Sequence, residues 1–252
     1  MTANSEIAVQ CFDVTYRINR RNLVEKLNFQ VLQGEVLVLL GRSGSGKTTT
    51  MKLINNLLTA TSGEVTVMGK PTTQWNPIQL RRKIGYVIQE IGLFPHFTVE
   101  QNVGLVPKLE GWEGDRIQDR VRELLKLVNL DPQHFAKRYP SQLSGGQRQR
   151  VGVARALAAD PPLLLMDEPF GALDPITRLE LQREFYQLQQ QLGKTVILVT
   201  HDIQEAFFLA SRIGLMADGR LVELAPPAEF LKSHHPEARA FLECLQLPGI
   251  SH

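Results

Sequence analysis

Continuous apolar runs are the clearest structural signal in this chain, and they predict strands of a parallel sheet. The runs are Val36–Leu40, Leu163–Asp167, which ends in an acid, and Thr195–Val199. Such runs are typical of strands that are covered by helices on both faces of a sheet. A helical segment follows each of them. The pattern therefore predicts an α/β protein.

Shorter patterns add further strands and one helix. A segment of alternating character, Ile7–Val14, precedes a second strand at Leu23–Leu32, and a helix is expected from Lys47 to about Leu58. The remaining expected strands are Val65–Met68 after a Ser-Gly-Glu turn, Ile84–Ile88, and a late hairpin over Gly214–Glu223 with an Asp-Gly turn.

Between Gln89 and about Arg155 the pattern changes to short amphipathic helices punctuated by proline and glycine. Arg116–Leu127 shows the helical spacing most clearly. We therefore expect one domain over residues 1–230, with a core of about 1–89 and 156–230 and a helical insert of about 90–155. Residues 231–252 are expected to form a short helical tail.

Composition excludes several classes of protein. Among 252 residues, 21% are charged and 43% are hydrophobic, which is ordinary for a globular chain, and the net charge of +2 indicates neither nucleic acid nor an anionic membrane as partner. The two cysteines lie at opposite ends and form neither a metal motif nor a disulfide framework. No apolar run approaches the ~18 residues of a membrane span, and the N-terminus lacks the order of a signal peptide. If the chain works at a membrane, another protein is expected to hold it there.

A glycine-rich loop, Gly41–Thr48, is the strongest chemical signal, because it has the spacing of a phosphate-binding loop between a strand and a helix. Its glycines let successive backbone N–H groups point at one anion, and the helix N-terminus adds its positive end. Lys47 can reach the β- and γ-phosphates, and the Thr48 hydroxyl can bind magnesium. A glycine-rich turn that matches by chance is disfavoured by this context.

Polar residues at strand ends are the second signal. Asp167 can hold magnesium through water, and Glu168 can orient or deprotonate an attacking water. Taken alone, these acids could merely cap the following turn, but the phosphate loop upstream disfavours that interpretation. Gln89 and His201 also follow strands, where an amide or a histidine is more often structural than functional.

The pentapeptide Leu143-Ser144-Gly145-Gly146-Gln147 is expected to open a helix with a second anion-binding nest. One chain has only one triphosphate to hold, so a second nest has a use if it serves the triphosphate of another copy. By itself, the pentapeptide is also compatible with an ordinary helix start that contains glycine.

Taken together, these motifs resemble the ATPase subunit of an ATP-binding cassette (ABC) transporter, over about residues 6–230. The resemblance implies a phosphate-loop NTPase core with a mixed, mostly parallel sheet, an antiparallel β subdomain and a helical insert. The family's motifs follow in its order: an adenine-stacking Tyr16, the phosphate loop Gly41–Thr48, the glutamine loop at Gln89, the signature Leu143–Gln147, the second acidic motif Leu163–Glu168, the Ala172-Leu173-Asp174 turn and the switch histidine His201.

The resemblance also implies roles, with ATP and Mg²⁺ as cofactors. Glu168 would be the catalytic carboxylate and His201 would hold the γ-phosphate, while the metal shell would be shared by Thr48, Gln89 and Asp167. The residues implied to contact ATP within one copy are Tyr16, Gly41, Arg42, Ser43, Gly44, Ser45, Gly46, Lys47, Thr48, Thr49 and Gln89. Those implied to contact the ATP of a facing copy are Ser144, Gly145, Gly146, Gln147 and Asp174.

One stretch is more discriminating within the family. Residues 84–103, together with Val106–Leu109 and Trp112, resemble bacterial importers of glycine betaine, choline and carnitine. Many of those subunits carry regulatory domains after the ATPase, and this chain ends at His252, so sensing by such domains is not expected. An importer of another solute such as an amino acid, or an exporter, is the alternative, since exporter cassettes share every catalytic motif.

The implied partners are a second copy of the chain, transmembrane permease subunits and, indirectly, a solute-binding protein, but no nucleic acid. The insert would meet the permease at the cytoplasmic face of the inner membrane. Leu93–Val103 is the expected contact segment, although its apolar residues could equally pack against the core. A soluble ABC ATPase acting on ribosomes or DNA is disfavoured, because the chain has one cassette and no long coiled coil. The solute stays open, since the binding protein and permease select it.

Overall fold

The structure is a computed structural model that describes residues 6–89 and 92–245. The chain divides into two compact units: unit 1 comprises Met1–Leu80 and Thr195–His252, and unit 2 comprises Arg81–Lys194. Glu90 and Ile91 at the start of the expected insert, and residues 246–252 of the expected tail, lie outside the described residues. Within the described ranges, no helix is both long enough and apolar enough to cross a bilayer.

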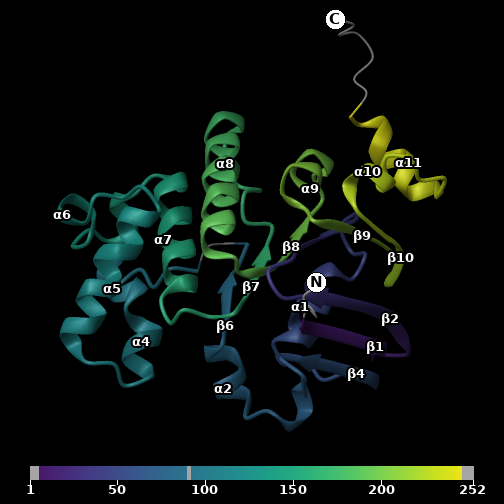
Figure 1. Ribbon diagram of the computed structural model, residues 1–252, viewed down its shortest axis with the longest axis horizontal. Helices are drawn as coiled ribbons and strands as arrows, with labels where there is room; N and C mark the ends of the chain where they lie inside the picture. Colours follow the sequence, from purple (N-terminus) through teal and green to yellow (C-terminus); the bar gives the residue numbers. More distant parts are fainter. Residues whose placement is uncertain (1–5, 90–91, 246–252) are drawn as a thin grey trace, which may run out of the picture. The chain divides into compact units, whose positions relative to one another are not determined.

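Unit 1 contains a sheet centred on β3 (Val36–Leu40), which is parallel to β8 (Thr195–Thr200) on one side and to β9 (Arg212–Ala217) on the other (Figure 1). β10 (Arg220–Ala225) continues this sheet antiparallel to β9 through the expected Asp-Gly turn. Every residue of β3 and β8 is buried. The predicted parallel strands of unit 1 are thus confirmed, with α1 (Lys47–Ile54) and α9 (Ile203–Leu209) in the same unit.

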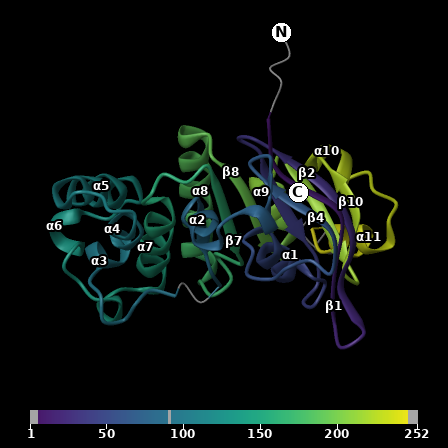
Figure 2. The ribbon, with the colours of Figure 1, turned by 90° about the horizontal axis from the view of Figure 1, so that it is seen from below.

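A second, antiparallel sheet in unit 1 has the order β2 (Arg21–Leu32), β1 (Ile7–Ile18), β4 (Ser62–Val67) and β5 (Lys70–Pro71), followed by η1 (Thr72–Gln74). Figure 2 shows β1, β2 and β4 side by side. This sheet confirms the antiparallel β subdomain that the family resemblance implied.

Several expected boundaries in unit 1 were wrong: β4 begins at Ser62, where a turn was expected, and three strand or helix ends differ for a backbone reason. β1 continues beyond Val14, because Asp13 adopts a φ of 46° and shifts the register between Cys11 and Val14. α1 ends well before Leu58, since Asn56 is left-handed at a φ of 53°. β4 likewise ends before Met68, whose φ is 52°.

Unit 2 contains a pair of parallel strands, β6 (Ile84–Val87) and β7 (Leu163–Asp167), in which Val87 lies opposite Met166. α2 (Pro77–Arg82) spans the boundary between the units. Gly85 allows the end of the helix at residues 145–157 to pack closely on β6, because a Cβ at this position would lie 2.4 Å from the Ala156 carbonyl oxygen.

The remaining elements of unit 2 are helical, as the change of pattern predicted, and Figure 2 shows α3 to α7 gathered together. Amphipathic α5 buries Val121, Leu124 and Leu125 and leaves its other face exposed. The bounds are α3 (Val99–Val103), α4 (Leu105–Leu109), α5 (Gly114–Leu127), α6 (Pro132–Phe135), η2 (Pro140–Gln142), α7 (Gly145–Leu157) and α8 (Pro175–Leu192).

Two short helices lie at the end of unit 1: α10 (Pro227–Phe230) just precedes the expected tail, and α11 (Pro236–Glu243) lies within it. Phe230 is fully buried and its ring lies 6.0 Å from that of Phe207, while Ala238 is also fully buried. Both short helices are therefore packed parts of unit 1.

Candidate functional site

The phosphate loop of unit 1 has a backbone that only glycine adopts easily. Gly44 has a φ of 81° and Gly46 a φ of 99°, and a Cβ on Gly46 would lie 2.7 Å from the Leu23 carbonyl oxygen. Gly46 is also the N-cap of α1, and it provides no side-chain hydrogen bond to the first turn. The start of α1 is therefore suited to receive an anion on its backbone N–H groups.

Lys47 holds a buried positive charge at this loop. The residue is only 5% exposed, and its Nζ donates to the carbonyl oxygens of Gly41 at 2.8 Å and Arg42 at 2.9 Å. A buried ammonium needs such partners. These bonds keep the charge inside the loop, where a phosphate would meet it.

Neighbouring elements of unit 1 support the loop from one side. The turn between β9 and β10 contacts it through Gly219 N–H, which donates to the Ser45 carbonyl oxygen at 3.2 Å. The Val24 side chain lies close to Gly46, and Val24 pairs with Tyr16 across β1 and β2. The half-buried Tyr16 ring thus lies one strand away from the loop.

His201 follows β8 as the phosphate loop follows β3, and the last residues of these parallel strands, Leu40 and Thr200, lie opposite each other. His201 is exposed. Its turn is fixed by Thr200, whose hydroxyl donates to Glu205 Oε2 at 2.6 Å and accepts from Asp202 N–H at 3.0 Å. The turn therefore presents His201 at the same sheet edge as Gly41.

Unit 2 brings together the expected polar residues that follow β6 and β7. Gln89 Nε2 donates to Glu168 Oε2 at 3.3 Å. Asp167 is only 5% exposed. Burial, and to a lesser degree the negative charge of Asp167, raises the pKa of Tyr86 to about 12.

Glu168 has a left-handed backbone with a φ of 45°. For a residue other than glycine this conformation is strained, typically by about 1–3 kcal/mol, and such strain is concentrated at functional sites. The following turn is closed by the Glu168 carbonyl oxygen, which accepts from Gly171 N–H at 3.2 Å. Glu168 therefore closes the turn with its backbone carbonyl, while its side-chain carboxylate accepts from Gln89.

The expected second nest is instead a capped helix N-terminus, because neither Gly145 nor Gly146 has a positive φ. Ser144 Oγ accepts from Gln147 N–H at 3.3 Å, and Gln147 Oε1 accepts from Ser144 N–H at 3.0 Å, which is a capping box. A Cβ on Gly146 would lie 2.7 Å from Thr177 Cγ2. The signature therefore packs directly against the start of α8.

Asp174 is the N-cap of α8, and its Oδ1 accepts from Thr177 N–H at 3.1 Å. Hydrogen bonds from Thr177, first from its hydroxyl and then from its amide, lower the pKa of Asp174. Since Thr177 also faces Gly146, unit 2 holds the signature and Asp174 close together.

The expected contact segment, Leu93–Val103, is divided between the interior and the surface. Val99, Asn102 and Val103 are fully buried, whereas Phe94 is 47% exposed. Asn102 organises the preceding loop, because it accepts from Phe94 N–H at 2.8 Å and donates to the Phe97 carbonyl oxygen at 3.1 Å.

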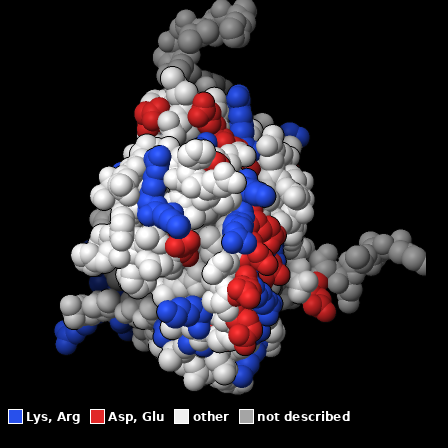
Figure 3. Space-filling model, turned by 90° about the vertical axis from the view of Figure 1, so that its left-hand side faces the viewer, with Lys and Arg blue, Asp and Glu red and all other residues white. Residues whose placement is uncertain are grey.

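A groove of about 740 Å³ lies among α3, α4, α5 and α6. Phe97, Ile117 and Val121 contribute apolar surface to it. Its charged lining is more basic than acidic. The acidic lining residues are Glu100 and Asp131, and the basic ones are Lys108, Arg122, Lys126 and Lys137. Figure 3 views the side on which α5 and α6 lie in Figure 1, where acidic and basic side chains stand next to each other.

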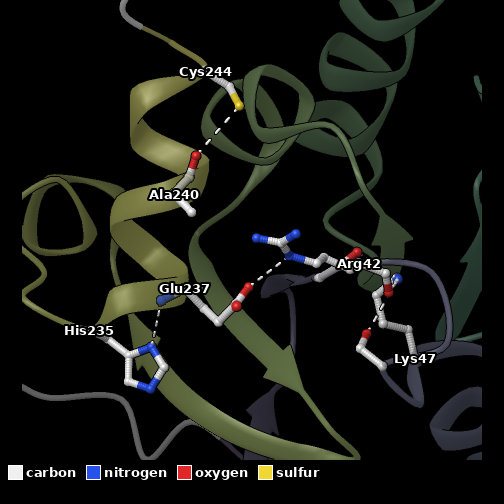
Figure 4. Close-up of polar contacts among 8 residues, drawn as sticks. Arg42, Lys47, His235, Glu237, Ala240 and Cys244 are labelled. Atoms are coloured by element: carbon white, nitrogen blue, oxygen red, sulfur yellow. Dashed lines mark hydrogen bonds and ion pairs between the residues drawn. The ribbon is translucent and has the colours of Figure 1, made fainter.

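Sequence reasoning missed Glu237, which lies in α11 and contacts the phosphate loop of the same unit (Figure 4). Arg42 Nε donates to Glu237 Oε2 at 3.0 Å. The two residues are 195 positions apart, and no motif or periodicity links them.

Comparison with known proteins gives a consistent result. The family model described as ABC transporter matches residues 24–171. The chain is 53% identical over 213 residues to the glycine betaine/carnitine/choline transport ATP-binding protein of Bacillus subtilis, covering 84% of this chain and 56% of that protein. It is 52% identical over 208 residues to the osmoprotectant import ATP-binding protein of Salmonella typhimurium, covering 82% of this chain and 54% of the relative. The chain thus spans about half the length of the curated relatives it matches.

Solved structures agree with the fold. The dimeric ATP-binding cassette MJ0796 in a post-hydrolysis state, bound to ADP and Pi, aligns with a TM-score of 0.77 and 35% identity, over 87% of this chain and 98% of that one. The cbiO1 protein of Clostridium perfringens, part of an ABC transporter complex, aligns with a TM-score of 0.82 and 28% identity, over 96% of both chains.

Proposed function

The chain belongs to the ABC transporter family, and we propose that it is the ATP-hydrolysing subunit of a bacterial importer for quaternary-amine osmoprotectants such as glycine betaine. The observation that carries this proposal is the anion-ready phosphate loop of unit 1, and the Gln89–Glu168 contact, which lies within unit 2, is separate support. The solute class rests on identities of 52–53% to transport proteins named for betaine, carnitine, choline and osmoprotectants.

ATP binding is assigned to unit 1. Backbone N–H groups at the start of α1 and the Lys47 ammonium bind the phosphates, with Gly41–Thr49 forming the cradle, and Tyr16 stacks on adenine. The support for this assignment is the uncapped helix start, the buried Lys47 and the position of Tyr16 one strand from the loop.

Magnesium fits the chemistry of the donors, because Thr48, Asp167 and Gln89 all offer oxygen ligands, which this hard cation prefers. When bound, the metal neutralises charge on the β- and γ-phosphates. Buried Asp167 carries the fixed negative charge that a cation needs nearby.

Hydrolysis is assigned to Glu168 and His201. Glu168 accepts a proton from the attacking water, Gln89 orients the carboxylate, and His201 donates a hydrogen bond to the γ-phosphate as negative charge accumulates. The strained backbone of Glu168 and the presentation of His201 at the sheet edge support these roles.

Two copies act together in this proposal. Ser144, Gly145, Gly146 and Gln147, with Asp174, bind the ATP held by the facing copy, so the interface is isologous. The close packing of the signature against the start of α8 in unit 2 supports a joint role for these residues. The dimeric MJ0796 cassette provides the precedent.

Transport requires a permease, and the groove among α3 to α6 is the proposed contact site. We propose that the groove binds a cytoplasmic helix of the permease, and that this helix carries an apolar face and acidic side chains. The apolar floor and the excess of basic over acidic lining residues support this chemistry. The chain would then work at the cytoplasmic face of the inner membrane, with a solute-binding protein as an indirect partner. The proposed domain limits remain 1–230, with the insert at 90–155.

Uptake of labelled glycine betaine at high osmolarity tests the proposal, in a host that lacks other betaine uptake systems. The native chain should restore uptake, whereas Glu168→Gln should not. Lys108→Glu in the groove should lose uptake while the purified chain keeps its ATPase activity. Uptake that does not depend on the native chain, despite normal ATPase activity, would contradict the osmoprotectant assignment and favour another solute or an exporter.

A further inference from the structure

The phosphate loop carries an arginine whose side chain is bound to an element outside the family's motifs. Arg42 is the second residue of the loop, and its carbonyl oxygen accepts from Lys47 Nζ at 2.9 Å. Its guanidinium instead donates from Nε to Glu237 Oε2 of α11 at 3.0 Å (Figure 4). The backbone of Arg42 thus belongs to the phosphate cradle, while its side chain is held by the C-terminal helix.

A series of hydrogen bonds fixes the backbone at the start of α11 and so fixes the position of Glu237. Its backbone N–H donates to His235 Nδ1, the N-cap of α11, at 3.2 Å, and His235 N–H donates to Ser233 Oγ at 3.1 Å. The Ser233 hydroxyl in turn donates to Glu223 of β10. Ala238, next to Glu237, is fully buried. The carboxylate is therefore attached to a packed element beside the loop.

Two anions can therefore compete for one guanidinium. A guanidinium is a strong donor to phosphate, and the side chains of Arg42 and Glu237 are 68% and 35% exposed, so their pair is accessible to solvent and exchangeable. The carboxylate also adds negative charge close to a loop that must receive a triphosphate.

We propose that Glu237 competes with nucleotide phosphate for Arg42, so that α11 sets the affinity of the phosphate loop for ATP. The inference rests on the proposed function, because it requires that the loop binds ATP. It adds an affinity-determining residue that lies outside the motifs of the family.

Equilibrium binding of a fluorescent ATP analogue to the purified chain tests this inference. Glu237→Gln keeps the size of the side chain and removes its charge, and it should bind the analogue about threefold to fivefold more tightly than the native chain at low salt. Because the pair is exposed, the difference should shrink as ionic strength rises. Unchanged or weaker binding by Glu237→Gln would overturn the inference.

A double-mutant cycle distinguishes competition for Arg42 from a general charge effect. In an Arg42→Gln background, Glu237→Gln should no longer change the affinity, and a persisting gain would overturn the inference. Asp119→Asn is the matched control, since it breaks an exposed pair with Arg122 of 2.9 Å and alters the net charge equally. It should leave the affinity unchanged, and a gain equal to that of Glu237→Gln would also overturn the inference. If the native chain fails to bind the analogue at all, the proposed function itself fails.

Discussion

Gln89 Nε2 lies 3.3 Å from Glu168 Oε2, and this contact joins the residues that follow two paired parallel strands. The contact matters because Glu168 has a strained, left-handed backbone, and such strain is concentrated at functional sites. An amide donor at this position orients the carboxylate without neutralising it. Gln89 is therefore well placed to orient Glu168, the proposed catalytic base.

Lys47→Ala should weaken ATP binding by about 30-fold or more, because a buried, hydrogen-bonded charge is removed from the phosphate site. Isothermal titration of ATP into the purified variant measures the loss. Lys52→Ala, an exposed lysine on the same helix, is the matched control and should bind ATP normally. Unchanged affinity in Lys47→Ala would contradict the assignment of the phosphate loop.

Ser144→Arg should fold and bind ATP but hydrolyse it about 100-fold more slowly, since we propose that the signature contacts only the ATP of the facing copy. Steady-state phosphate release at several protein concentrations checks this expectation. Asn76 caps α2 in a comparable way, because its Oδ1 accepts from Ile78 N–H at 3.0 Å. Asn76→Arg therefore controls for the loss of a helix cap alone. Equal turnover in the Ser144→Arg and native proteins would argue against a facing dimer.

Arg150 and Glu184 join the signature helix α7 to α8 through two parallel hydrogen bonds of 3.0 and 2.8 Å. Glu184→Ala should lower the free energy of unfolding by about 1–3 kcal/mol, because it leaves a mostly buried guanidinium without its carboxylate. Thermal unfolding measures the change. Asp119→Ala, which breaks the exposed pair with Arg122, should cost less than about 0.5 kcal/mol. Equal losses of unfolding free energy in the two variants would show that the Arg150–Glu184 pair stabilises the fold no more than an exposed pair does.

The two cysteines should differ in reactivity. Burial raises the pKa of the Cys11 thiol to about 12, whereas Cys244 is exposed. At pH 8 a maleimide should therefore label Cys244 alone in the native protein, and both thiols in denaturant. Above about pH 8.5 the unfolded chain releases a proton that native Cys11 keeps, so the free energy of unfolding should fall as pH rises. Rapid native labelling of Cys11, detected by mass spectrometry, would contradict this burial.

The central strands could be predicted from the sequence to the residue, because β3 and β7 are continuous apolar runs with clear ends. The same reasoning failed at β1, where Asp13 interrupts the alternation with a left-handed residue that no pattern indicates. It also made α1 too long, since apolar residues continue after Asn56 has already turned the chain.

The candidate site divides in the same way. Residues in motifs, such as Lys47 and Glu168, could be proposed as site residues from the sequence, because the chemistry proposed for them requires fixed neighbours along the chain. The helix start at the signature was expected from the sequence, but its capping box was not, since two glycines are compatible with either a nest or a regular helix start. Glu237 could not be identified at all, because its contact with Arg42 arises only when the tail packs in unit 1.

The most direct test of the central claim is to measure ATP binding, ATP hydrolysis and mass in solution on the same preparations of native protein and Glu168→Gln. The account predicts that the variant binds ATP with near-native affinity, hydrolyses it at least about 100-fold more slowly, and accumulates as a dimer when ATP is added. Near-native hydrolysis by Glu168→Gln, or a variant that binds ATP and remains monomeric, would contradict the account.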